Sequence, residues 1–156
     1  VSNPKFIVAD ESVAALDVSI QADILNLLKQ LQNELDLTYL FISHDLSVVA
    51  HVCDIVAVMY LGHIVEMAPS RKLFKNPKHS YTKALLSSIP SIDPENKSTA
   101  IELKGEIPSA MDPPSGCVFR TRCPNPTHDC KEGNIQMGLI EVSPNHWVDQ
   151  CCVNCH

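Results

Sequence analysis

The chain has 156 residues and a formal net charge of −6, with 45% hydrophobic and 19% charged residues. This composition is typical of a globular protein with one domain and a small addition, and the acidic balance argues against a nucleic-acid partner, because phosphate backbones are bound by basic surfaces. No apolar run approaches the roughly 20 residues that cross a bilayer, and the chain does not begin with a basic-then-apolar leader. We therefore expect a cytoplasmic location.

The first third of the chain alternates apolar runs with a long amphipathic pattern. Residues 6–9 and 38–42 are apolar and predict buried parallel strands. Asp17 is well placed to cap the N-terminus of a helix between them. Six apolar residues at helical spacing predict one buried face of this helix: Ile20, Ile24, Leu27, Leu28, Leu31 and Leu35.

Shorter elements follow the second strand. Their order of strand, helix, strand, helix and strand predicts right-handed crossovers and a parallel sheet that includes a third strand. The expected elements are a helix over 45–53, a strand over 55–60, a turn at 61–63, a returning strand over 64–67, and helices over 69–74 and 81–89.

The composition changes near residue 90. From Pro90 onward proline and polar residues dominate, and long apolar periodicities are few. Six of the seven cysteines also lie in the last 40 residues, which in a cytosolic chain is more typical of metal binding than of disulfides. We therefore expect two domains, residues 1–90 and 91–156, the second held together by its cysteines more than by a large core.

Polar side chains end the first two predicted strands. Asp10 and Glu11 follow the first strand, and His44 follows the second. Because the carboxyl ends of neighbouring parallel strands carry the ligand sites of open α/β sheets, these side chains form a hydrolytic constellation. Asp10 can hold a hydrated Mg²⁺, Glu11 can polarise a water for attack on a γ-phosphate, and His44 can contact that phosphate. An isolated Asp-Glu pair would more often simply end a strand and begin a turn.

The residues around these side chains strengthen the hydrolytic interpretation. Residues 10–21 read Asp-Glu-Ser-Val-Ala-Ala-Leu-Asp-Val-Ser-Ile-Gln and resemble the Walker B strand and D-loop of ABC transporter ATPases. Residues 41–45, Phe-Ile-Ser-His-Asp, resemble the H-loop of the same family. The order of the motifs, their spacing and the helix between them all agree with that family.

The resemblance implies a fold and a set of roles. The fold is α/β, the C-terminal part of the parallel sheet and helices of a P-loop NTPase, with a small appendage rich in cysteine and proline. Asp10 is the carboxylate associated with Mg²⁺, Glu11 the general base and His44 the γ-phosphate contact. Asp17 is the D-loop carboxylate that faces a second ATPase subunit, a catalytic role that is compatible with capping the helix.

Two positions depart from the family pattern, and several motifs are missing. Ser12 stands where the family usually has proline, and Ala14 stands where the D-loop usually has serine. The Walker A loop, the Q-loop and the signature motif, which precede Walker B in the family, are absent from the sequence. We therefore interpret the chain as the C-terminal part of a longer protein, which by itself binds ATP weakly or not at all.

Two later segments resemble the oligopeptide/dipeptide subfamily of these ATPases. Residues 76–86 are similar to a segment typical of the subfamily, with Ser80 in place of a proline. The tail carries four cysteines in the subfamily's order: Cys117, Cys123, Cys130 and Cys151. The resemblance implies a [4Fe–4S] cluster at these positions, although the last cysteine lies one residue later than in the usual pattern.

The sequence leaves the state of the cysteines open. Thiolates suit Zn²⁺ as well as Fe–S clusters, and reduced thiols without a ligand are the third alternative, because spacing alone does not discriminate. Residues 152–156, Cys-Val-Asn-Cys-His, offer a weaker zinc half-site. His79 and His128 are expected on the surface, and Trp147 is expected to anchor the tail by burial.

The sequence thus predicts the ATP-hydrolysing subunit of an ABC importer for oligopeptides or dipeptides, peripheral to the cytoplasmic side of the cell membrane. The resemblance implies ATP and Mg²⁺ as cofactors. It implies as partners a second ATPase subunit, two membrane permeases and, indirectly, a peptide-binding protein. The alternative is a stand-alone Fe–S or zinc module on a degenerate NTPase scaffold, without ATPase activity.

Overall fold

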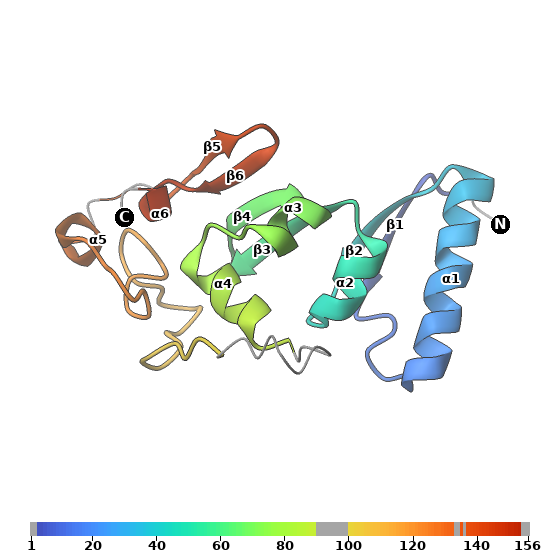
Figure 1. Cartoon of the computed structure of the whole chain (residues 1–156), viewed down its shortest axis with the longest axis horizontal. Coiled ribbons are helices and arrows are strands. Elements are labelled where there is room, and N and C mark those ends of the chain that lie inside the picture. Colours follow the sequence, from blue (N-terminus) through green and yellow to red (C-terminus); the bar gives the residue numbers. More distant parts are fainter. Residues whose placement is uncertain (1–2, 90–99, 133–134, 136, 154–156) are drawn as a thin grey trace. The chain divides into compact units, whose positions relative to one another are not determined.

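The structure, a computed structural model, describes residues 3–89, 100–132, 135 and 137–153. It divides the chain into two compact units, Val1–Cys53 and Asp54–His156 (Figure 1). The domain boundary expected near residue 90 lies outside the described residues, and the division there stays a prediction. None of the described helices is long and apolar enough to cross a membrane.

A pair of parallel strands forms the centre of the first unit. Strand β1 (Phe6–Asp10) pairs with β2 (Thr38–Ile42), with Phe6 opposite Thr38 and Asp10 opposite Ile42. Helix α1 (Val18–Leu35) connects the two strands and lies alongside them, and α2 (Leu46–Val52) follows β2 (Figure 1). The first two predicted strands are therefore parallel and joined by the predicted helix.

Aspartates begin both helices of this unit. The Asp17 carboxylate accepts a hydrogen bond from the Ile20 backbone N–H at 3.0 Å, which confirms the predicted N-cap of α1. The Asp45 carboxylate accepts hydrogen bonds from Ser47 and Val48 at 2.8 and 3.3 Å and caps α2 in the same way. Each cap satisfies N–H groups that have no partner within the helix.

The hydrophobic core of the first unit is small. Three buried side chains form its centre with three half-buried neighbours: Val13, Leu25 and Val48, then Ile24, Phe41 and Val52. The prediction of one fully buried face on α1 is wrong at three of its six positions, since Ile20, Leu27 and Leu35 are exposed. A two-stranded sheet is too narrow to cover the whole apolar face of an 18-residue helix.

One face of the parallel strand pair is also open. Phe6, Val8, Leu40 and Ile42 alternate along the strands and are 46 to 56% exposed. Both strands were expected to be buried, and this expectation is wrong for the chain as described. No described element of the first unit packs on this face, so its apolar side chains meet solvent.

The second unit contains an antiparallel sheet with the strand order β3-β4-β6-β5. Strands β3 (Ile55–Tyr60) and β4 (His63–Pro69) form a hairpin. The third predicted strand was expected in the parallel sheet, and this expectation is wrong: among the described strands β3 pairs with β4. Leu61 and Gly62 have φ angles of 46° and 79°, and a two-residue turn with positive φ at both positions favours an antiparallel hairpin.

The C-terminal residues complete this sheet. Strand β6 (His146–Asp149) pairs with β4, with Glu66 opposite Val148, and β5 (Leu139–Ser143) pairs with the outer edge of β6. The described residues of the same unit include four short helices: α3 (Ser70–Lys75), α4 (Ser80–Ser87), α5 (His128–Glu132) and α6 (Gln150–Val153). Residues on both sides of position 90 therefore share one sheet.

The tail shares a hydrophobic core with residues that precede position 90, contrary to expectation. Phe119 is 1% exposed, and its ring centroid lies 5.2 Å from that of Tyr60 and 5.8 Å from that of Tyr81. Val65 of β4 and Val148 of β6 are also buried, at 0 and 1% exposure. The sequence pattern did not reveal this core, because its residues come from separate short segments and not from one periodic element.

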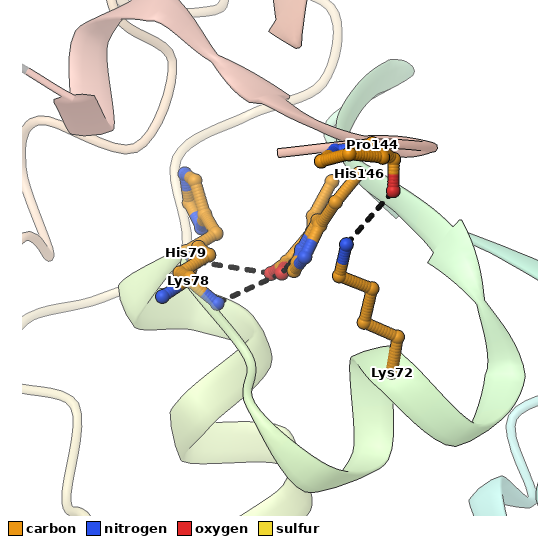
Figure 2. A network of polar contacts seen from close by, with 6 residues as sticks. Lys72, Lys78, His79, Pro144 and His146 are labelled. Atoms are coloured by element: carbon orange, nitrogen blue, oxygen red, sulfur yellow. Dashed lines mark hydrogen bonds and ion pairs between the residues drawn. The ribbon is translucent and has the colours of Figure 1, made fainter. Parts of the chain in front are cut away.

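A buried carboxylate connects three segments of the second unit. Glu66, in the middle of β4, is fully buried. Its Oε1 accepts hydrogen bonds from the Lys78 N–H at 2.8 Å and from Nε2 of His146 at 2.7 Å, and its Oε2 accepts from the His79 N–H at 2.9 Å (Figure 2). Glu66 therefore ties β4 to the start of α4 and to β6.

Glu66→Gln is expected to destabilise the second unit by about 2 to 3 kcal/mol, because an amide offers one acceptor oxygen to three N–H donors. Urea unfolding followed by the fluorescence of Trp147, the only tryptophan, measures the loss. The exposed Glu106→Gln is the matched control. A change within about 0.5 kcal/mol, the usual range for surface substitutions, would contradict this role.

His79 is fully buried, which corrects the expectation that it lies on the surface. Its Nδ1 accepts a hydrogen bond from the Tyr81 N–H at 3.1 Å, so the neutral ring caps α4. Burial lowers the pKa of His79 to about 4, and the opposing effect of Glu66 is smaller. His128, the second histidine expected on the surface, is exposed.

The free energy of unfolding should therefore decrease as the pH is lowered, because His79 is buried in its neutral form. An unfolded histidine has a pKa near 6.5, so between about pH 6.5 and 4 the unfolded state binds a proton that the native state excludes, at a cost of about 3 kcal/mol. His79→Asn keeps an acceptor at the helix cap and should remove this part of the pH dependence. Urea unfolding at pH 7 and pH 4.5 tests it, and an unchanged pH dependence in His79→Asn would contradict it.

Candidate functional site

The end of the parallel strand pair places the predicted hydrolytic residues. Asp10 is the last residue of β1 and is exposed. The Glu11 N–H donates to the Ile42 carbonyl oxygen at 2.9 Å, so the strand pairing extends one residue past β1. His44 follows β2 by two residues. The three side chains therefore come from the carboxyl ends of adjacent parallel strands, as expected.

Glu11 and His44 are in direct contact. Oε1 of Glu11 lies 3.1 Å from Nδ1 of His44, and the two side chains are 59 and 73% exposed. An exposed ion pair or hydrogen bond of this kind contributes little to stability. The contact brings together the two residues that the sequence assigned to water activation and phosphate contact.

The backbone of Glu11 is strained. Its φ of 44° lies in the left-handed region, which costs a residue with a Cβ roughly 1 to 2 kcal/mol. The Ala14 N–H donates to the Glu11 carbonyl oxygen at 3.1 Å, so Glu11 is the first residue of a hydrogen-bonded turn. This hydrogen bond uses only the backbone of Ala14, and the missing serine hydroxyl does not affect it. Strain that stability does not explain is characteristic of functional sites.

The residues on either side of His44 position it. The Asp45 N–H donates to the Ser43 hydroxyl oxygen at 3.0 Å, and the Asp45 carboxylate caps α2. His44 therefore lies between a strand end and a capped helix. The sequence analysis gave Ser43 and Asp45 no role, although an aspartate before an apolar helical pattern is an N-cap signal. Asp17 is exposed, and its Oδ1 is used to cap α1.

The cysteines form a second candidate site, inside the second unit. Cys117, Cys130 and Cys151 are each no more than 2% exposed. The Sγ atoms of Cys130 and Cys151 lie 3.2 Å apart. A hydrogen bond with the Cys151 side chain is the main cause that lowers the pKa of Cys117, and burial opposes it. Three of the four predicted ligands therefore converge, and Cys123 is half-buried.

Polar groups surround the converging thiols. The Thr127 hydroxyl donates to Cys130 Sγ at 3.1 Å, and the Cys151 N–H donates to Asp149 Oδ1 at 3.2 Å. In the part of the chain that the structure describes, no three His, Cys, Asp or Glu side chains reach a metal-binding arrangement. Cys152 is buried, and the rest of the weaker half-site, residues 154–156, lies outside the described residues.

Sequence reasoning missed the buried polar residues of the second unit. Glu66, His146 and Asp149 are at most 1% exposed. The available signal was a carboxylate inside the apolar run Ile-Val-Glu-Met-Ala, since a charge within a strand is retained there only with partners. Burial raises the pKa of Asp149, and hydrogen bonds from the Cys151 and Gly138 backbones oppose that shift.

Comparison with known proteins relates the chain to one class of protein. Residues 65–130 match the family model described as the C-terminal region of oligopeptide/dipeptide transporters. The chain is 57% identical over 148 residues to the putative oligopeptide transport ATP-binding protein YkfD of Bacillus subtilis, which covers 94% of this chain and 44% of that protein. It is therefore a homologue of the ATP-binding proteins of oligopeptide and dipeptide transporters.

Further relatives carry similar names. The chain is 53% identical over 148 residues to the oligopeptide transport ATP-binding protein AppF of B. subtilis, covering 94% of this chain and 44% of that protein. It is 52% identical over 130 residues to the dipeptide transport ATP-binding protein DppF of Haemophilus influenzae, covering 83% of this chain and 40% of that protein. The chain spans less than half the length of these relatives.

Proposed function

We propose that this chain supplies the hydrolytic half of an ATPase site that energises the import of oligopeptides or dipeptides. The observation that carries the proposal is the strained Glu11 held 3.1 Å from His44 at the ends of two adjacent parallel strands. The names of the relatives support the peptide substrate. A metal-binding module without ATPase activity accounts for the cysteines but not for the strain at Glu11.

The residues of the chain divide the chemistry between them. Bound ATP with Mg²⁺ supplies the phosphoryl group that is transferred to water, and Asp10 would hold the Mg²⁺ through water. Glu11 is exposed to solvent and takes the proton of the attacking water. Because an ionised carboxylate only accepts hydrogen bonds, Nδ1 of His44 carries the hydrogen in their contact. Nε2 of His44 would then be the ring nitrogen available to contact the γ-phosphate.

The same proposal assigns partners and a location. Asp17 is exposed beyond its helix-capping contact and would face a second ATPase subunit. Two membrane permeases would couple hydrolysis to transport, and a peptide-binding protein would deliver the substrate to them. The ATPase would then lie at the cytoplasmic face of the membrane. The relatives' names, which refer to peptide import and transport, support the link to a peptide transporter.

Glu11→Gln should lower ATP turnover by the intact transporter at least about a hundredfold, because the amide cannot accept the proton of water. ATP binding should be retained. Phosphate release and nucleotide binding are measured together, with Glu34→Gln on the exposed side of α1 as the matched control. Normal turnover in Glu11→Gln, or an equal loss in Glu34→Gln, would sink the assignment.

We also propose that Cys117, Cys130 and Cys151, completed by Cys123, hold a [4Fe–4S] cluster, with Zn²⁺ as the second candidate. The convergence of three buried thiols supports this proposal. The lowered pKa of Cys117 favours the thiolate, which is the form that binds metal. The cysteine side chains are suitable ligands for either group, since thiolates bind both Fe–S clusters and Zn²⁺.

Anaerobically purified protein should show an absorption band near roughly 400 nm and about four iron atoms per chain. Cys130→Ser should lose both, whereas Cys53→Ser in the first unit should retain them. About one zinc atom and no band would assign the site to zinc. If the wild-type protein contains neither iron nor zinc, or if both variants lose the metal equally, the proposal is contradicted and the cysteines are reduced thiols without a ligand.

A further inference from the structure

A cavity of about 390 Å³ lies in the second unit, and Cys123, the proposed fourth ligand of the metal centre, is among its lining residues. It is lined by side chains of α4, by residues 101–104 and by residues 121–125. A cavity of this size is within the range of small-molecule sites in proteins. Glu11, His44 and the three converging cysteines, Cys117, Cys130 and Cys151, are not among its described lining residues.

The charged lining of the cavity is mostly basic. Lys83, Lys104 and Arg122 line it, with Glu102 as the only acidic residue among the described lining residues. This gives the lining a formal charge of +2 in a chain whose net charge is −6. A concave site lined by one sign of charge concentrates ions of the opposite sign. The cavity therefore favours anions.

Arg122 contributes a guanidinium group to the lining of the cavity. Its Nε is buried and has no hydrogen-bond partner among the described residues. Leaving a buried charged donor without an acceptor costs more than an ordinary unmade hydrogen bond. The planar guanidinium group matches the paired oxygens of phosphate and carboxylate groups. Arg122 therefore contributes to the lining a group suited to an oxyanion.

The walls of the cavity are held by contacts that do not involve a ligand. The Ile101 N–H donates to the Ser87 hydroxyl oxygen at 2.8 Å, which attaches the start of the 101–104 segment to α4. Gly105 has a φ of 84°, a left-handed conformation that favours glycine, and it lies in van der Waals range of the Thr121 carbonyl oxygen. A site with fixed walls loses little conformational entropy on binding.

We propose that this cavity binds a small phosphorylated molecule, with Arg122, Lys83 and Lys104 around its phosphate group. The charge of +2 on the lining matches the two negative charges of a phosphate near neutral pH. The volume exceeds what inorganic phosphate fills, which favours an organic phosphate with the rest of the molecule along residues 101–104. The proposal does not rest on the proposed ATPase, and of the proposed metal ligands the described lining shares Cys123.

Titration of the ¹⁵N-labelled chain tests the proposal, with backbone amide shifts of Lys104, Thr121 and Asn125 as the readout. The probes are inorganic phosphate and glycerol 3-phosphate at constant ionic strength, with chloride as the reference anion. The sequence contains no glycine-rich phosphate loop to compete for these probes. Saturable shifts at these amides are expected, with a Kd of about 1 mM or tighter for glycerol 3-phosphate.

Substitutions separate this site from general attraction of anions. Lys104→Gln and Arg122→Gln should each raise the Kd about tenfold or more, whereas the exposed Lys75→Gln on α3 removes the same charge outside the cavity and should not. Lys104 is exposed, so its variant tests the site even if Arg122→Gln fails to fold.

Arg122→Lys should retain part of the affinity, because it keeps the charge and loses the paired donors. Tighter binding of glycerol 3-phosphate than of inorganic phosphate supports an organic ligand, and the reverse order would leave free phosphate as the ligand and overturn that part of the proposal. Shifts that do not saturate, or an equal loss of affinity in Lys75→Gln, would overturn the site itself.

Discussion

The buried carboxylate of Glu66 is the interaction on which the second unit depends. A buried charge is retained only where its desolvation is offset by hydrogen bonds, and Glu66 accepts three, from the Lys78 and His79 backbones and from His146 (Figure 2). These partners belong to the start of α4 and to β6. The strand next to the cysteines and the helix that lines the basic cavity are therefore anchored to the same residue of β4.

The two units place their reactive groups in opposite environments. Glu11 and His44 are exposed and are positioned by backbone strain and capped helices, as suits side chains that must meet water and a phosphate. Cys117 and Cys130 are buried in a packed interior, as suits thiols that hold a ligand away from solvent. The proposals for hydrolysis and for a metal centre therefore rest on separate parts of the chain and fail separately.

Prediction from sequence succeeded where the signal is local. Asp17 was expected as a helix cap, and the hairpin around Leu61 and Gly62 was expected from its turn residues, because both depend on a few neighbouring positions. It failed where partners are distant. The partner of β3 and the burial of His79 depend on segments far away in the chain, and a lone histidine carries no pattern that reveals them.

The sequence alone determined the order of strands and helices up to residue 89, the cap of α1, and the set of residues at the strand ends, because these follow from spacing and side-chain chemistry. Only the tertiary structure decided that Glu11 takes a left-handed backbone to reach His44, and that three of four cysteines converge while Cys123 lines a cavity. It also decided that the tail joins the β3–β4 hairpin as one sheet. Those outcomes depend on contacts between residues up to 80 positions apart, such as Glu66 and His146, which local pattern does not encode.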